Sequence, residues 1–258
     1  KLTFILLLAR QLVWMKGRGD MKSIPAVGLL AGNLLVTIGL YYVISSDMGS
    51  ALVYVCIFAC MAFAAGVALR WFALGIFGAG AGFYLLWELD KIPPYMKERF
   101  QVLVDHSLYP LEAGWQQTRS LLAIGGGRLT GQGLLHGAQT QSTSSVNLPF
   151  RHTDFIFCVC GEELGMIGCL VVIALLAAII IRVLLVARRA ETPFHCYVCV
   201  GVAAMLIFQT VVNIGMCLFV MPVIGLTLPF FSYGGSSLLT LYAAMGVVSG
   251  IKKRSPVV

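Results

Sequence analysis

Long stretches without charged residues set the pattern of this chain. Five of them contain no Lys, Arg, Asp or Glu: residues 23–46, 48–69, 71–87, 164–181 and 192–251. A helix needs about 20 apolar residues to cross the hydrocarbon core of a bilayer, and its backbone polar groups are satisfied internally. The last stretch is long enough for two such helices and is interrupted by Pro222 and Pro229. The pattern therefore predicts membrane spans near residues 24–45, 48–68, 71–88, 156–181, 196–218 and 230–251.

The composition agrees with a membrane protein. Hydrophobic residues make up 59% of the 258 residues and charged residues 11%, whereas a soluble globular chain carries roughly 25% charged residues. Residues 1–15, KLTFILLLARQLVWM, are apolar around Arg10 and are interpreted as the end of a further span. The predicted fold class is an all-α polytopic membrane protein. Residues 1–258 are expected to form a single transmembrane domain of six full spans and a partial N-terminal span.

Basic residues give the expected orientation. They gather in the short segments between spans, which the positive-inside rule places in the cytoplasm: Lys16, Arg18, Lys22, Arg70, Arg182, Arg188, Arg189, Lys252, Lys253 and Arg254. The loop of residues 89–155 then lies on the extracytoplasmic side. Because topology accounts for the net charge of +7, no nucleic-acid partner is expected.

The cysteines do not predict a metal site. All eight lie in apolar stretches, and Cys196 and Cys199 beside His195 have no second Cys/His pair near them in the sequence. Structural zinc takes four ligands, so these thiols are interpreted as small buried side chains.

The long outer loop is where function is expected, because long loops on a rigid scaffold commonly carry it. Pro93 and Pro94 precede a segment, Tyr95–Leu103, that predicts a surface helix, with a solvated charged turn as the alternative. Further along, GGGRLTGQGLLHG has the glycine spacing of a nucleotide-binding loop. However, Gln132 and Gly133 replace the residues that hold phosphate and Mg²⁺. Its glycines predict tight turns, either plain or with backbone N–H groups that hold an anion.

Polar residues crowd the start of the helix predicted after this loop, in LPFRHTDFIFCVCGEELG. Either Thr153 or Asp154 suits a helix cap, which satisfies N–H groups at a helix start. Asp154 equally suits a functional carboxylate. Glu162 and Glu163 lie where the helix enters the bilayer, and a charge at a helix centre there costs roughly 2.5–3.5 kcal/mol. At about 100° per residue neither glutamate pairs locally with Asp154. Both are therefore expected to pair with another helix.

Several segments resemble the SEDS (shape, elongation, division and sporulation) proteins, the RodA/FtsW family. They are NLPFRHTDFIFCVCGEELGMIG, NIGM followed by MPVIGLTLPFFSYGGSS, AGWQQTRSLLAIGGG and SSDMGSALV. The resemblance covers nearly the whole chain in the family's order. It implies a peptidoglycan glycosyltransferase of the bacterial inner membrane with ten transmembrane helices, of which this chain begins inside the fourth. Such enzymes polymerise lipid II outside the membrane, for cell shape and elongation or for division, and work with a class B penicillin-binding protein as transpeptidase.

The resemblance also implies the site. Asp154 in HTDFIF matches the family's proposed catalytic aspartate, and Lys1 and Arg99 match two of its basic residues. A general base takes the proton of the attacking hydroxyl, and fixed cations stabilise the leaving diphosphate. The expected substrate-binding residues are Lys1, Arg99, Arg128, Arg151, His152 and Thr153. No cofactor is assigned, and a divalent cation at the lipid diphosphate is left open.

Two departures from the family pattern concern donor binding. Phe150 replaces the usual Glu of LPE, and Gln132 stands where many members have a basic residue. Two other functions stay open: a lipid II flippase, in which Asp47, Glu162 and Glu163 line a route for the headgroup, and a noncatalytic scaffold.

Overall fold

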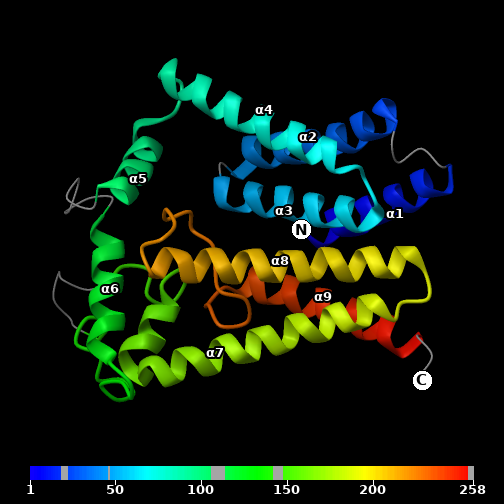
Figure 1. Ribbon diagram of the computed structural model, residues 1–258. Helices are drawn as coiled ribbons and strands as arrows, with labels where there is room; N and C mark the ends of the chain where they lie inside the picture. The colour runs from blue at the N-terminus through cyan, green and yellow to red at the C-terminus, as the bar shows by residue number, and fades with distance from the viewer. Residues whose placement is uncertain (19–22, 46, 106–113, 142–147, 255–258) are drawn as a thin grey trace. The chain divides into compact units, whose positions relative to one another are not determined.

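Every regular element in the described part of the chain is an α-helix. The structure is a computed structural model and describes residues 1–18, 23–45, 47–105, 114–141 and 148–254. The helices are α1 (Leu2–Gly17), α2 (Ile24–Ser45), α3 (Met48–Ala65), α4 (Leu69–Glu88), α5 (Pro94–Val104), α6 (Trp115–Gly127), α7 (Ile156–Arg188), α8 (Pro193–Cys217) and α9 (Gly235–Arg254) (Figure 1). The predicted all-α fold class is confirmed.

Five of the described helices are long and apolar enough to cross a membrane: α2, α3, α4, α7 and α8. They match predicted spans, so the prediction of a multi-pass membrane protein is confirmed. α7 continues past the predicted end at residue 181 to Arg188, because the residues around Arg182 are apolar and sustain the helix. The sixth predicted span corresponds to α9, which starts later, at Gly235, and ends on basic residues. These polar ends lower its hydropathy and keep it outside the five.

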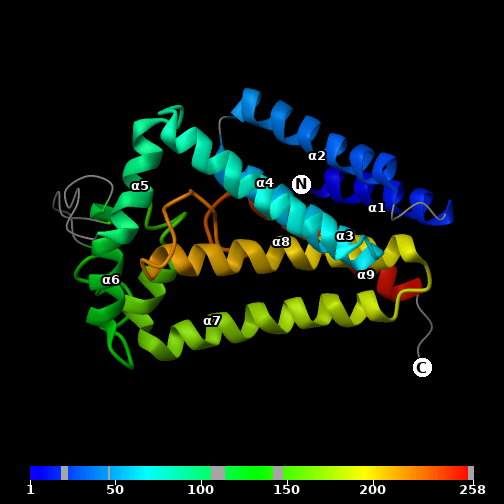
Figure 2. The ribbon, with the colours of Figure 1, turned by 45° about the horizontal axis from the view of Figure 1, so that its top comes forward.

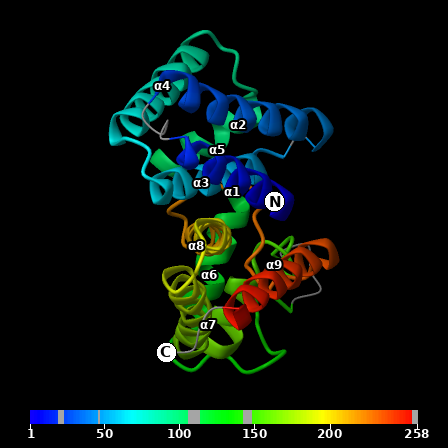
Figure 3. The same ribbon diagram turned by 90° about the vertical axis from the view of Figure 1, so that its right-hand side faces the viewer.

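The chain divides into two compact units, each built from separated segments. The first holds Lys1–Leu85, Ile179–Phe208 and Leu239–Val258, and the second holds Leu86–Ala178 and Gln209–Leu238. Within the first unit α1, α2 and α3 pack on one another (Figure 3). At their contact the ring of Tyr54 lies edge-on to Phe4 at 5.2 Å and to Tyr41 at 5.5 Å. Residues 1–258 were expected to form a single transmembrane domain. That expectation depends on how the two units combine, and it stays a prediction.

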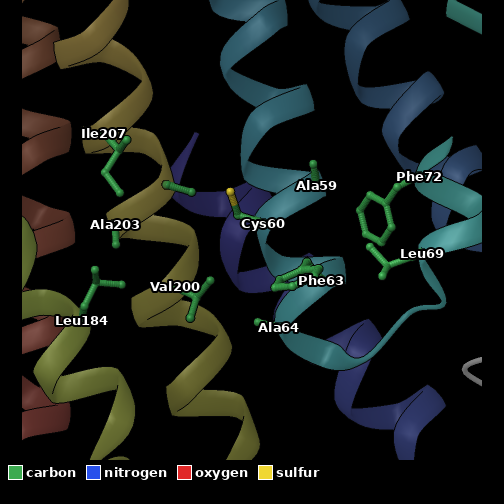
Figure 4. Close-up of a pocket in the computed structure, with 11 residues that line it drawn as sticks. Ala59, Cys60, Phe63, Ala64, Leu69, Phe72, Leu184, Val200, Ala203 and Ile207 are labelled. Atoms are coloured by element: carbon green, nitrogen blue, oxygen red, sulfur yellow. The ribbon is translucent and has the colours of Figure 1, made fainter. Parts of the chain in front are cut away.

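The first unit contains an apolar groove of about 480 Å³. Its lining comes from α3, the start of α4, α7 and α8 (Figure 4): Ala59, Cys60, Phe63, Ala64, Leu69, Phe72, Leu184, Val200, Ala203, Ala204 and Ile207. Apart from the thiol of Cys60, these side chains offer no group that transfers a proton. Acid–base chemistry therefore needs a different place in the chain.

The second unit surrounds the start of α7. In this unit α5 leads on to α6, which lies beside that start (Figure 2), and the last turns of α8 lead into a loop of residues 218–234. Pro222 and Pro229 keep this loop from continuing as a helix. Side chains from α6, α7, the end of α8 and the loop of residues 218–234 share one core, which includes Ala123, Leu148, Phe155, Phe157, Cys217, Val223 and Leu228. The core places the loop of residues 218–234 against the start of α7.

Candidate active site

A compact turn of residues 150–155 precedes α7 and carries Asp154. The carbonyl oxygen of Phe150 accepts hydrogen bonds from the N–H groups of Thr153 (3.1 Å) and Phe155 (3.2 Å) and from the Thr153 hydroxyl (3.2 Å). The first helical bond runs from the N–H of Val159 to the carbonyl of Phe155. Asp154 therefore precedes the residue in the capping position, and the Thr153 hydroxyl donates within the turn.

The backbone of this turn is strained at Phe150. Its φ of 56° lies in the left-handed region, where a bulky residue costs on the order of 1–3 kcal/mol and persists only if its surroundings enforce it. Phe230, in the facing loop, also has a positive φ, of 63°. Strain of this kind clusters at functional sites, which makes the turn a stronger candidate than its sequence alone suggests.

Three consecutive carbonyl groups of the turn, those of residues 152–154, are held from outside. Their donors are, in chain order of the acceptors, the N–H of Tyr233 (2.9 Å), the hydroxyl of Ser232 (2.6 Å) and the side-chain amide of Asn213 (2.8 Å). These donors come from α8 and from the loop of residues 218–234. The main chain that carries the predicted catalytic residue is thus fixed on one side by a second segment.

Gly225 lies next to the carboxylate of Asp154. A Cβ atom added to Gly225 would stand 3.8 Å from Oδ2 of Asp154, and Gly225 itself has a φ of +71° that favours glycine. Gly225 itself adds no side chain beside this carboxylate. Asp154 is half-buried, so its carboxylate remains within reach of a ligand.

Arg99 reaches the same loop from α5. Its Nη1 donates to the carbonyl oxygen of Val223 at 2.5 Å, and its guanidinium carbon lies 5.9 Å from the centre of the Tyr95 ring. Val223 and Gly225 are two residues apart. The structure therefore brings two of the predicted site residues, Asp154 and Arg99, to one short segment.

Of the other predicted residues, Arg151, His152 and Thr153 belong to the turn of residues 150–155, whereas Arg128 and Lys1 lie elsewhere. Nε of Arg151 lies 3.2 Å from Nε2 of the exposed His152. Arg128 ends α6, and its carbonyl accepts from the N–H of Met166, about 15 Å along α7 from its first turn at 1.5 Å per residue. Lys1 belongs to the first unit, and its relation to Asp154 stays a prediction. The roles expected for all these residues also stay predictions.

Glu162 and Glu163 are buried, with 0% and 6% of their surface exposed. Both oxygens of Glu162 accept backbone N–H groups, from Gln139 (2.7 Å) and Thr140 (2.9 Å). Glu163 accepts from the N–H of Leu135 (3.0 Å) and from the side chain of Gln141 (2.6 Å). The expectation that another helix pairs with them is wrong, because their partners belong to the glycine-rich loop of residues 128–141.

The same loop is joined to α7 through the backbone. α7 is interrupted at Gly165, whose φ of 68° and ψ of −166° are not helical. Beyond the break, Met166 and Ile167 donate to the carbonyls of Arg128 and Leu129 at 2.9 and 3.2 Å. In return, Gln132 and Gly133 donate to the carbonyls of Glu162 and Glu163 at 2.9 and 3.1 Å. Loop and helix thus exchange hydrogen bonds across the break.

These contacts bear on the two predictions for the glycine segment of residues 125–137. Within it the N–H of Leu135 donates to the carboxylate of Glu163, and just beyond it the N–H groups of Gln139 and Thr140 donate to that of Glu162. Contact of the segment with an anion from outside the chain stays a prediction. Close approach requires the glycines, since a Cβ at Gly127 would overlap the carbonyl oxygen of Gly161 and one at Gly131 that of Glu163. Within the described residues, no group of three or more His, Cys, Asp or Glu side chains is placed to hold a metal ion. The sequence analysis left open a divalent cation at the lipid diphosphate, and this point stays open.

Comparison with known proteins identifies the family. A family model described as "Cell cycle protein", for FtsW, RodA and SpoVE, matches residues 1–256. The chain belongs to this family. The resemblance seen in the motifs is therefore confirmed.

Two curated relatives show how much of the family's length is present. Over 205 residues the chain is 38% identical to the peptidoglycan glycosyltransferase MrdB of Escherichia coli, which covers 80% of this chain and 54% of MrdB. Over 234 residues it is 37% identical to the probable peptidoglycan glycosyltransferase FtsW of Coxiella burnetii, covering 90% of this chain and 59% of that protein. The chain thus spans a little over half the length of these relatives.

Solved structures agree with the fold. One, described as "Structural coordination of polymerization and crosslinking by a peptidoglycan synthase complex", matches with a TM-score of 0.79 and 31% identity over 98% of this chain and 68% of that one. The rod shape determining protein RodA of Thermus thermophilus matches with a TM-score of 0.64 and 27% identity, over 100% of this chain and 65% of RodA.

The residues that hold the turn of residues 150–155 were not predicted. Asn213, Ser232 and Tyr233 lie in segments quoted for the family resemblance, but no role was assigned to them. One signal was present: an amide such as Asn213 inside a membrane helix is costly unless it is bonded.

Proposed function

We propose that this chain forms the reaction centre of a peptidoglycan glycosyltransferase that polymerises lipid II into glycan strands. The names of its relatives MrdB and FtsW support this activity. The observation that carries the proposal is the turn of residues 150–155: its backbone is held by three donors, and its aspartate stands beside Gly225 on the loop that Arg99 reaches.

The chemistry assigns Asp154 as the general base. The acceptor hydroxyl attacks the anomeric carbon of the donor sugar, a carbon–oxygen bond forms, and the bond to the diphosphate breaks with its electron pair. The hydroxyl proton passes to Asp154, which needs to lie within about 2.6–3.2 Å of that oxygen. The negative charge leaves with the diphosphate and needs fixed cations nearby.

Arg99 is the first candidate for that cation. A guanidinium has five N–H donors, so its bond to Val223 leaves others for phosphate oxygens. Lys1, Arg128 and Arg151 are further candidates for the diphosphate, and His152 and Thr153 for the surroundings of the base. A class B penicillin-binding protein is the proposed partner, supported by the similarity to a synthase complex that coordinates polymerization and crosslinking.

The proposed location is the bacterial inner membrane, with the turn of residues 150–155 on the extracytoplasmic side. Support comes from the basic residues between the predicted spans. An impermeant thiol reagent applied from outside should label a cysteine at the exposed position Leu134 but not one at Glu191, compared with the parent protein. Labelling at Glu191 alone would reverse the orientation and remove the assignment.

The flippase alternative has lost the observations that suggested it. Glu162 and Glu163 bind the glycine-rich loop, and Asp47 caps α3 by accepting from the N–H of Ser50 at 3.2 Å. None of the three is placed as a spare charge along a headgroup route.

The test of the proposed function is Asp154→Asn in the complete protein. Asparagine keeps the shape and the backbone bonds of the residue but removes the base, and general-base losses are typically about 10²–10⁴-fold. Purified protein is given lipid II, and the glycan products are resolved on a gel, with folding checked by the thermal unfolding midpoint. Near-normal glycan synthesis by Asp154→Asn would remove Asp154 from the mechanism.

A further inference from the structure

One buried amide joins the two segments that meet at the candidate site. Asn213 lies on α8 with 0% of its surface exposed. Its Nδ2 donates to the carbonyl oxygen of Asp154 at 2.8 Å and to that of Leu226 at 2.6 Å. One side chain therefore bridges the turn that carries the base and the loop that carries Gly225.

The two carbonyls determine how this amide is oriented. A primary amide nitrogen has two hydrogens, and each has one acceptor here. Turning the amide over would bring Oδ1 against two carbonyl oxygens, which repel it. Oδ1 itself has no hydrogen-bond partner among the described residues, so the nitrogen alone makes the bridge.

The bridge also relates Asp154 to Arg99. Leu226 follows Gly225 directly, and Val223, which accepts from Arg99, is three residues before Leu226 in the same loop. A change in the Asp154–Leu226 spacing would therefore change the distance between the carboxylate and the guanidinium.

We propose that Asn213 is a positioning residue for the glycosyl transfer: it sets where the carboxylate of Asp154 stands relative to the loop of residues 223–226. The inference rests on the proposed function. Asn213 touches no reacting atom, so its loss should slow the chemical step and leave substrate binding nearly unchanged. A misplacement of about 1 Å in an active site can cost about 10²-fold in rate.

Gln117 offers a matched control within the same unit. It is also a buried amide, 1% exposed, and its Nε2 donates to the carbonyls of Met216 (3.3 Å) and Met221 (2.7 Å). It bridges the end of α8 to the start of the same loop, but it does not touch the turn of residues 150–155. Removing it tests what a lost buried bridge does to this region in general.

The experiment compares Asn213→Leu with Gln117→Met, each of which removes a two-donor bridge at similar side-chain size. Both are made in the complete protein, and kcat, the apparent KM for lipid II and the thermal unfolding midpoint are measured. Asn213→Leu should lower kcat by about 10²-fold with KM changed less than about threefold. Gln117→Met should lower the midpoint by a similar amount and keep kcat within about threefold.

A graded variant keeps the test decisive if Asn213→Leu does not fold. Asn213→Ser retains one hydroxyl donor, which reaches one carbonyl at a time, and its kcat should fall between those of the parent and Asn213→Leu. Equal kcat losses in the Asn213 and Gln117 variants would overturn the proposal, as would a normal kcat in Asn213→Ser. Asp154→Asn, assayed alongside, separates the two claims: if it is inactive while the Asn213 variants are normal, only the positioning role fails.

Discussion

Asp154 and Glu162 stand about two helical turns apart on one stretch of chain, yet the protein binds them in opposite ways. At Asp154, side-chain and backbone donors take the carbonyls of residues 152–154 and so fix the main chain. At Glu162, backbone N–H groups take both oxygens of the carboxylate itself. Asp154 is half-buried, whereas Glu162 has no exposed surface.

The difference shows why a costly carboxylate in a membrane protein is not by itself a functional one. The free-energy cost of burying a carboxylate in the membrane marks Glu162 and Glu163 as candidates for a functional role. Both are structural, because they hold the glycine-rich loop of residues 128–141. A carboxylate that is to accept a proton needs a fixed backbone and an approachable side chain. In the second unit, the turn of residues 150–155 meets both conditions.

The largest expected effect compares the same chemical change at both places. Asp154→Asn should reduce glycan synthesis by about 10²–10⁴-fold at an unchanged unfolding midpoint. Glu162→Gln should do the reverse, because the new NH₂ group faces a backbone N–H and leaves it unsatisfied, at about 1–3 kcal/mol of unfolding free energy. Thermal unfolding and kcat per folded molecule measure both. A catalytic loss in Glu162→Gln without a loss of stability would end the distinction.

The next effect concerns how closely α6 approaches α7. Gly127→Ala would place a Cβ against the carbonyl oxygen of Gly161 and 2.9 Å from Cα of Glu162, and overpacking of this kind costs about 1–3 kcal/mol. Gly125→Ala, two residues earlier, meets nothing within 4 Å and should be neutral or stabilising by about 0.5–1 kcal/mol, since alanine favours a helix. The unfolding midpoint of Gly127→Ala should fall, whereas that of Gly125→Ala should stay unchanged or rise. An equal fall in both variants would contradict the close approach.

A smaller effect is expected at Arg99. Arg99→Ala should raise the apparent KM for lipid II about tenfold, equivalent to about 1.4 kcal/mol, and Arg99→Lys should restore only part of it because lysine lacks the planar fork. Arg119→Ala is the control, because Arg119 stacks on Trp115 at 4.2 Å and bonds Gln139 of the glycine-rich loop. Identical kinetics for the parent and Arg99→Ala would leave Arg99 with a structural contact only.

The smallest effect is expected at the surface pair of Asp90 and Lys97. The Lys97 ammonium bonds the exposed Asp90 carboxylate and holds the pKa of that group below its usual value. A lowered folded pKa means that the pair contributes at neutral pH and that the contribution is lost as pH falls through that value. Solvent screens so exposed a pair, so Asp90→Asn should leave the unfolding midpoint unchanged. NMR titration should find a pKa of Asp90 below its usual value, and this pKa should rise towards that value in high salt. A pKa above the usual value at low salt would contradict the ion pair.

The sequence predicted the helices better than the connections between them. Apolar stretches predicted α2, α3, α4 and α8 nearly at their observed bounds, and α7 at its start but not at its end. Pro93–Pro94 marked the start of α5. α6 was not predicted, because its sequence ends in three glycines and its packing on α7 is a tertiary effect. The motif resemblance led to Asp154, to the residues directly before it and to Arg99, but not to Asn213, Ser232 and Tyr233, which hold the turn of residues 150–155.

The contacts that hold the site could not be predicted from the sequence pattern, and the reason is physical. Several of the deciding contacts are made by backbone N–H groups, that of Tyr233 at the turn of residues 150–155 and those of Gln139 and Thr140 at Glu162. A backbone group has no letter in the sequence. The partners of Glu162 were therefore sought among side chains of another helix. They follow instead from the path of the loop of residues 128–141.

The reciprocal hydrogen bonds between the loop of residues 128–141 and α7 at Gly165 have a consequence for motion. Four N–H groups form hydrogen bonds between the loop and the helix, those of Gln132, Gly133, Met166 and Ile167. None of them can exchange with deuterium unless the loop and the helix separate. Their deuterium uptake should share one opening free energy, as expected for a single cooperative unit. In its dynamics, the loop of residues 128–141 belongs to α7: whatever loosens the loop opens that helix at its break.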